Sequence, residues 1–450
     1  MLARHPYAAF MHAALTLHCA YTTAANDPLL FYDSRGSRMS EQVRYYEQAG
    51  GQGSRAGSRS RLAAYLLLAS CSVVLLPQPA NADPVSAPSF AGPLVANPDP
   101  VVIDAGWLGQ VSVTGQVSGI GVLQSHASHS GGIGNRDGFV DVSNAQVEIQ
   151  TTTGPLQFYV QAGAYSLPSL GTAYLRATQA TDQLYGPVPV AYAKAMISPE
   201  LSVSGGLLPT MIGAESTFTF QNMNIERGLL WNQEPAISRG VQLNYARGPV
   251  SAAISLNDGY FSGKLNWLSA SLSYAIDGSN TITLVGAGSL SQNSKSSAAT
   301  PLLQNNSRIF NVIYSHTSGR LTITPYLQYS HVDRDVRLGI DRAANIYAGA
   351  VLMKYTFNQN WSLAARGEYL KTTGGTCGSE PDCAPTNLLY GAKSDAWSVT
   401  ATPTFQSGIF FVRGELSYTR IGNLAAGAGF DRNFDRRSQA RAAIETGFLF

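Results

Sequence analysis

The sequence has few charged residues and no long hydrophobic run. Asp, Glu, Lys and Arg together make up 13% of its 450 residues, about half of the quarter that is usual in soluble domains. No stretch reaches the roughly 18 consecutive apolar residues that a transmembrane helix needs. A chain that is poor in charge and lacks helical spans fits a transmembrane β-barrel, because only every second residue of such a barrel must be apolar.

Cysteine is also scarce, and an excess of basic residues is absent. Two of the four cysteines, Cys377 and Cys383, share a Gly- and Pro-rich loop, and we expect them to form a small disulfide in an oxidising compartment. Two thiols without a nearby His do not predict a metal site, and no cofactor is expected. The 30 basic and 28 acidic residues give no reason to expect a nucleic-acid partner.

Residues 55–82 have the order of a secretory signal peptide. Three Arg residues precede an apolar run that ends at Leu76, and a small-residue cleavage site ends at Ala82. We therefore expect the mature protein to begin at Asp83. A lipid-modified Cys71 is less favoured, because the apolar run continues past it. Residues 1–54 are expected to be either an extended leader or part of a reading frame that was begun too early, with Met39 as the candidate for the true start. No fold is assigned to them.

A Pro-rich linker, residues 83–104, is expected to open the mature chain, and residues 105–450 to form one barrel. The C-terminal stretch gives the clearest pattern, because apolar and polar side chains alternate there with the period of two that indicates a strand. One parity contains Ala440, Ala442, Ile444, Thr446, Phe448 and Phe450, and the other contains Arg437, Gln439, Arg441 and Glu445. A strand that ends the chain on an outward Phe resembles the C-terminal assembly signal of bacterial outer-membrane proteins, with Phe448 and Phe450 as its residues. The alternative is an edge strand of a soluble sheet.

The same alternation recurs in hairpins that have one short turn and one long connection. The pattern predicts an all-β fold, a transmembrane antiparallel up-and-down β-barrel of about 16 strands. Aromatic residues such as Tyr355, Phe357 and Trp361 flank the short turns, as an interfacial girdle requires. Pro325 and Pro403 fall within predicted strands, and we expect a local bulge at each, since Pro cannot donate to the ladder.

One long stretch, Thr210 to Arg239, does not alternate, and a family resemblance is densest around it. The residues that carry it are the run from Gly206 to Glu215, then Asn222, Asn224, Arg227, Leu229, Leu230 and Pro235, then Gly240, Tyr245 and the run from Asn257 to Tyr260. In these residues the chain is similar to the OmpL-like β-barrel porin family, although that family more often has Asn-Gly-Trp at the last position. The resemblance implies an outer-membrane barrel with a channel for an undefined solute, and it brings no catalytic residue.

Charged residues with inward parity are the candidate pore residues. They are Arg366, Arg413, Arg437 and Arg441, interleaved with Glu368, Glu415 and Glu445. Facing lipid, each would cost about 2 to 4 kcal/mol near the midplane. In the lumen they would either rank solutes by charge or pair with one another and stiffen the wall.

The stretch from Thr210 to Arg239 is expected to fold into the lumen, because backbone groups left unpaired cannot lie in hydrocarbon and its side chains are too apolar for a solvated loop. Glu215, Glu226 and Arg227 would then face the inward Arg residues across a constriction. The alternative is a loop packed on the barrel rim.

These features predict an outer-membrane porin through which small hydrophilic solutes diffuse passively, integral to the membrane and in contact with its lipid. The barrel-assembly machinery is an expected partner, and a homo-oligomer is left open. A non-conducting adhesin or scaffold is the main alternative. An outer-membrane lipid hydrolase is less favoured, because His126, His129, His316 and His331 lie in no catalytic motif. No enzymatic activity is expected.

Overall fold

The computed structural model describes residues 92–127 and 133–450. The predicted leader, the signal peptide and the first part of the linker lie outside the described residues, so processing at Asp83 stays a prediction. None of the helices in the described part is long and apolar enough to cross a membrane.

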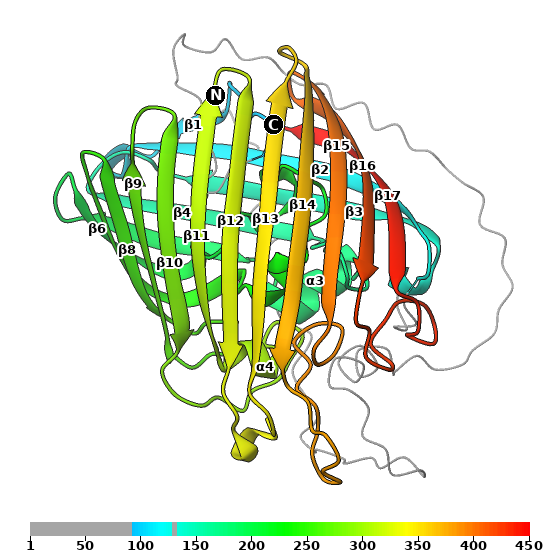
Figure 1. Ribbon diagram of the computed structural model, residues 1–450. Coiled ribbons are helices and arrows are strands. Elements are labelled where there is room, and N and C mark those ends of the chain that lie inside the picture. Colours follow the sequence, from blue (N-terminus) through cyan, green and yellow to red (C-terminus); the bar gives the residue numbers. More distant parts are fainter. Residues whose placement is uncertain (1–91, 128–132) are drawn as a thin grey trace, which may run out of the picture. The chain divides into compact units, whose positions relative to one another are not determined.

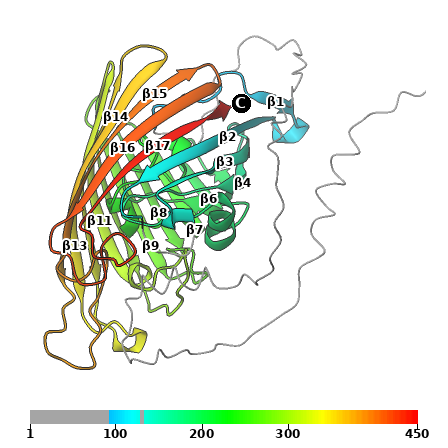
Figure 2. The ribbon, with the colours of Figure 1, turned by 90° about the vertical axis from the view of Figure 1, so that its right-hand side faces the viewer.

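Sixteen antiparallel strands close into a barrel (Figure 1). Each strand pairs with the next in sequence, and the last, β17, pairs with β2, so that no edge is left open (Figure 2). The ring contains β2 (Gln110–Gln124), β3 (Gly138–Gln150), β4 (Leu156–Tyr165), β5 (Val190–Met196), β6 (Leu201–Pro209), β7 (Ile237–Arg247), β8 (Val250–Asn257), β9 (Trp267–Ala275), β10 (Asn280–Ser289), β11 (Ser307–Ser318), β12 (Leu321–Val332), β13 (Ala344–Thr356), β14 (Trp361–Gly374), β15 (Asp395–Ser407), β16 (Phe410–Ile421) and β17 (Ser438–Leu449). The predicted fold class and strand number are confirmed.

The remaining elements are short. The strand β1 (Val101–Asp104) pairs with β2 and stands outside the ring. The helical turns are η1 (Gly106–Leu108), η2 (Ile133–Asn135), α3 (Ala177–Ala180), η3 (Thr181–Tyr185), η4 (Thr219–Gln221), η5 (Leu230–Gln233), α4 (Leu302–Asn305) and η6 (Val336–Leu338). Four of them, α3, η3, η4 and η5, belong to two connections that are described below.

The predicted parity of β17 is confirmed. Ile444 and Phe448 are exposed on the outer face, whereas Arg441 and Glu445 are buried inside the barrel. Arg437 is the exception, because β17 begins only at Ser438. The Arg437 side chain is exposed in the preceding loop and donates to the carbonyl of Gly422, so its predicted place in the lumen is wrong.

The two ends of the barrel differ in the length of their connections. Tight turns join β7 to β8, β11 to β12 and β15 to β16, and each contains a Gly (Gly248, Gly319 or Gly408) with φ of 56–57°, a conformation that residues with a Cβ rarely adopt. We call this end the short-turn end and the opposite end the long-loop end. The predicted aromatic residues Phe357 and Trp361 are exposed at the short-turn end.

The two strand prolines interrupt the ladder without a bulge. Between β11 and β12 the pairing stops at Tyr326 and resumes at Ile323 in the same register, and β15 and β16 likewise skip the pairs around Pro403. Each Pro costs ladder pairs on one side, while the other side of its strand stays paired. The predicted bulges are therefore wrong, because a missing donor does not require an extra residue.

The predicted disulfide is present. Cys377 and Cys383 are bonded in the connection between β14 and β15, at the long-loop end. The residues between the two cysteines, 378–382, are all exposed.

The C-terminal Phe450 extends the pairing of the barrel beyond β17. Its backbone N–H donates to the carbonyl of Gly115 over 2.8 Å, and its carbonyl accepts from the N–H of Gly115 over 2.6 Å. The Phe450 ring covers the same glycine, where a Cβ would come within 2.7 Å of a ring carbon. Phe450 therefore helps to join the last strand to the first.

Deleting Phe450 is expected to lower the yield of membrane-inserted barrel in cells several-fold, because it removes both the closing backbone pair and the proposed assembly signal. Refolding into detergent should suffer less. The measurement is the amount of folded, heat-modifiable protein in outer-membrane fractions at low expression. Phe357→Ala is the matched control, since that ring is as exposed at the same end. Equal yields of the deletion and the control would contradict the assignment.

Candidate pore and the segments inside the barrel

The connection between β6 and β7, residues 210–236, folds inside the barrel; we call it the lumen segment. Phe218, Phe220, Ile225 and Leu229 are each 1% exposed or less. A solvated external loop could not bury such side chains, and a buried backbone needs hydrogen-bond partners. The lumen segment finds them on the inward face of β14 to β17, so the predicted place inside the lumen is confirmed. It is shorter than predicted, because β7 begins at Ile237.

Arg366 of β14 holds the middle of the lumen segment. Its Nη1 atom lies 2.6 Å from Glu215 Oε1 and 2.8 Å from the carbonyl oxygen of Glu226. Its Nε atom donates to Glu368 over 3.1 Å. A Cβ at Gly228 would overlap the Glu368 carboxylate, so the segment can approach this wall closely only with Gly at that position.

Arg413 and Glu445, which face each other on β16 and β17, bind the first part of the lumen segment. Arg413 donates to the carbonyl oxygens of Thr219, Asn222 and Met223 over 2.8, 3.0 and 2.9 Å. Glu445 accepts from the Thr219 hydroxyl over 2.6 Å and lies 3.4 Å from Arg413. One cation thus satisfies three buried carbonyl groups.

Glu415 of β16 has the complementary role, because it accepts from backbone N–H groups. Those of Ile225 and Glu226 donate to its two oxygens over 2.6 and 3.0 Å, and the Thr402 hydroxyl donates over 2.7 Å. Charged wall residues therefore replace the strand partners that the irregular segment lacks.

Arg441 of β17 links the lumen segment to a second connection. Its Nη1 atom lies 2.7 Å from Glu226 Oε1 and also donates to the carbonyl oxygen of Ser169. Its Nη2 atom donates to the carbonyl oxygen of Thr172. These belong to residues 166–189 between β4 and β5, where Pro168 and Leu170 exchange backbone hydrogen bonds with Arg227. This second segment was not predicted. Its signal was a run of 24 residues without alternation, long for a simple loop.

The predicted pore residues are therefore brought together but are enclosed. Nine of them, Glu215, Glu226, Arg227, Arg366, Glu368, Arg413, Glu415, Arg441 and Glu445, are 6% exposed or less. Their ion pairs and hydrogen bonds are made within the wall, within the lumen segment or between the two, so the description as residues that line an open pore is wrong for this structure. The alternative, in which the charges pair and stiffen the wall, fits the structure. Their part in a constriction stays a prediction.

Arg227, which was predicted to face the inward Arg residues together with Glu215 and Glu226, makes its contacts within the lumen segment. Its Nη1 atom donates to the Thr217 carbonyl over 2.6 Å, and its guanidinium lies 5.8 Å from the centre of the Trp231 ring. Its contacts thus stabilise the fold of the lumen segment itself.

Glu234, near the end of the lumen segment, is 5% exposed, and within the described residues neither of its carboxylate oxygens has a hydrogen-bond partner. Burial, reinforced by Glu215 and Glu368, raises its pKa well above the ordinary value. A carboxyl group whose pKa is higher in the folded state costs stability as the pH rises through and above its unfolded pKa.

Glu234→Gln is therefore expected to raise the midpoint of thermal unfolding at pH 8 by about 2 °C or more. The gain should vanish near pH 3, where Glu234 is protonated in both states. Unfolding in detergent micelles at the two pH values measures it. Glu380→Gln in the exposed disulfide loop is the control. Glu380 forms an ion pair with Arg342 at the surface, and surface ion pairs contribute little to stability. A lower midpoint at pH 8 would refute the expectation.

The chain ahead of β1 docks at the short-turn end. Leu94 is 2% exposed and packs in a cluster with Phe218, Phe220, Phe411 and Leu449. The backbone of Val95 exchanges hydrogen bonds of 2.8 Å with the side chain of Gln406. The described part of the predicted linker is thus held against the barrel, and its last residues form β1.

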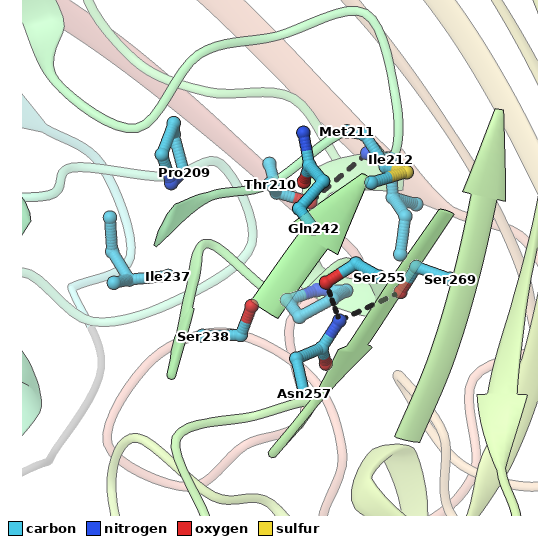
Figure 3. A pocket seen from close by; sticks show the side chains of 11 residues that line it. Pro209, Thr210, Met211, Ile212, Ile237, Ser238, Gln242, Ser255, Asn257 and Ser269 are labelled. Carbon is cyan, nitrogen blue, oxygen red and sulfur yellow. Dashed lines mark hydrogen bonds between the residues drawn. The ribbon is translucent and has the colours of Figure 1, made fainter. Parts of the chain in front are cut away.

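The lumen segment leaves space along the opposite wall, from β5 to β9. A cavity of about 310 Å³ opens near the short-turn end, with Lys194, Ser202, Asn244 and Ser271 among its lining residues. Towards the long-loop end lies a second, narrow space of about 10 Å³. Side chains from the end of β6 and from β7, β8 and β9 surround this narrow part (Figure 3).

Two kinds of chemistry find no support in the described part of the chain. No group of three or more His, Cys, Asp or Glu residues there could hold a metal ion. Both ring nitrogens of His331 are occupied, by Asn345 and Asp333, and the Nδ1 atoms of His316 and His126 lie against Asn280 and the Ser438 carbonyl. In the described part of the chain, none of these three rings is hydrogen-bonded to a Ser hydroxyl, as the His of a Ser–His hydrolase would be. His129 lies outside the described residues.

Solved structures of outer-membrane proteins are similar to this chain. OmpT from the outer membrane of Vibrio cholerae is 12% identical and has a TM-score of 0.50, over 78% of this chain and 100% of that one. A loop-deletion mutant of the same protein is 14% identical, with a TM-score of 0.48 over 76% and 99%. An anion-selective porin from Comamonas acidovorans is 10% identical, again with a TM-score of 0.48 over 76% and 99%. At these identities the likeness concerns the fold alone.

No curated protein matches the chain in sequence. A protein family does match, over residues 110–450, which include every strand of the ring. Its description is "Putative beta-barrel porin-2, OmpL-like". The chain belongs to this OmpL-like family of β-barrel porins.

Proposed function

We propose that the protein is an integral outer-membrane porin through which small hydrophilic solutes diffuse passively, with the lumen segment as its constriction. The observation that carries this proposal is a closed ring of 16 strands whose interior is only partly filled. A 16-stranded ring is wide enough for an aqueous channel. In outer-membrane barrels the short turns face the periplasm and the long loops face the outside of the cell. We assign the two ends of this barrel in the same way.

The outer face fits a membrane. Leu243, Leu272, Val312, Val351 and Ile444 are exposed on strands around the ring, and the charged wall residues named above all point inward. Because a charge on the lipid face would cost about 2 to 4 kcal/mol near the midplane, this division of side chains favours insertion. We infer that the barrel-assembly machinery inserts the chain and that outer-membrane lipid surrounds it.

Conductance tests the proposal. Residues 83–450, refolded in detergent and added to a planar bilayer, are expected to give stepwise increases in current. Folding is checked first by heat-modifiable migration. A correctly folded barrel that inserts and yet carries no current would overturn the porin function and favour the adhesin or scaffold.

A further inference from the structure

The open side of the lumen differs in chemistry from the filled side. The filled side, β14 to β17, contributes the enclosed Arg and Glu residues. On the open side the inward positions of β6 to β9 contain hydroxyl and amide groups, among them Ser204, Gln242, Asn244, Ser255, Ser269 and Ser271. A solute that crosses along this wall meets hydrogen-bonding groups without formal charge.

The cavity and the narrow space are neighbours along this wall. Gln242 borders the narrow space and Asn244, the next inward residue of β7, borders the cavity. On β9, Ser269 and Ser271 follow the same order. Because side chains two residues apart lie side by side on one face of a strand, the two spaces succeed each other along the wall.

The narrow space lies between the start of the lumen segment and this wall. Met211 and Ile212 of the lumen segment line it together with Gln242, Ser255 and Ser269 of the wall (Figure 3). A volume of about 10 Å³ holds about one water-sized probe. Met211 is half-buried, and its unbranched thioether side chain can change rotamer readily, so the opening can widen without a change in the barrel.

The charged residues that line these two spaces are of both signs. Lys194 of β5 and Glu200 of the following turn both border the cavity. One cation and one anion at the same mouth leave little net field to favour either sign of ion.

We infer that this path along β5 to β9 is the solute route and that it admits small uncharged polar solutes, of the polyol and small-sugar class, with little preference between anions and cations. Met211 and Ile212 set its size limit. This inference rests on the proposed porin function and adds the solute class and the position of the limiting opening.

Liposome swelling and bilayer recording test the route together. Proteoliposomes of residues 83–450 should swell faster in glycerol and arabinose than in sodium gluconate, and the reversal potential in a KCl gradient should lie near zero. Met211→Ala should raise the arabinose rate several-fold while changing the glycerol rate less. Gln242→Glu should shift the reversal potential towards cation selectivity.

Gln359→Glu in an exposed short turn is the charge control and should leave the reversal potential unchanged. Asn244→Asp, in the cavity, repeats the Gln242→Glu test should that variant not fold. If the parent protein conducts with strong selectivity for one sign of ion, or if Met211→Ala and Gln242→Glu change nothing, the route is wrong while the porin function stands. A folded parent that neither swells liposomes nor conducts overturns both.

Discussion

Replacing Thr217–Ile225 by a Gly-Ser bridge is expected to raise the single-channel conductance several-fold. These nine residues contain Phe218 and Phe220, which are buried in the lumen, and their removal leaves the inward face of β15 to β17 open to water. Arg413 and Glu445 would then border a hydrated passage, so the ion preference should change along with the conductance. Planar-bilayer recording in symmetric and asymmetric KCl measures both quantities.

The matched control removes nine residues from a place that contributes nothing to the lumen. Residues 376–384 hold the disulfide and lie in a mostly exposed loop between β14 and β15. Their replacement by the same bridge should leave the conductance unchanged. A correctly folded barrel without Thr217–Ile225 that conducts like the parent would show that these nine residues do not limit the channel.

The barrel itself could be predicted because its physical constraint is local. Lipid requires an apolar side chain at every second position, and this period is visible in β17 without any knowledge of its neighbours. The constraint ends where the strand ends. Arg437 continues the alternation in the sequence, but it lies in a loop. Outside a strand, odd and even positions do not correspond to the two faces of the barrel wall.

Occupation of the lumen was harder to predict, because parity gives the side of the wall and not what stands against it. Phe218 and Leu230 identified the lumen segment, since such side chains do not suit a solvated loop. The pairing of Arg366 with Glu215 depends on the path of the chain between two residues that are 151 positions apart, and its enclosure depends on the second segment as well. The inward Arg and Glu residues therefore suggested the lining of an open pore, whereas in the structure they form a buried network of ion pairs and hydrogen bonds.

Docking of the linker illustrates a similar limit. A Pro-rich composition predicts an extended chain, and the described part contains two bends before the strand β1. The burial of Leu94 results from an apolar cluster that the chain assembles from β16, β17 and the lumen segment. Composition could not indicate a contact whose other half comes from residues more than a hundred positions away.

Arg413→Ala is expected to destabilise the docked lumen segment by about 3 to 5 kcal/mol, the usual effect of removing one partner of a buried ion pair. The change leaves Glu445 buried without its cation and three carbonyl groups without a donor. Because the segment can leave the wall for a hydrated lumen, the loss should appear as a lower urea midpoint and as flickering between two conductance levels in single-channel records.

A second substitution separates the buried charge from the lost hydrogen bonds. Adding Glu445→Gln to Arg413→Ala removes the uncompensated carboxylate but restores no donor to the carbonyl groups of Thr219, Asn222 and Met223, so the double variant should recover part of the stability. Arg308→Ala is the control: its partner Asp333 is more than half exposed, as is Arg308 itself, and such surface pairs contribute about 0 to 1 kcal/mol. If Arg413→Ala costs no more than Arg308→Ala, the Arg413 contacts do not hold the segment in place. If the double variant recovers nothing, the cost lies in the three carbonyl groups rather than in the charge of Glu445.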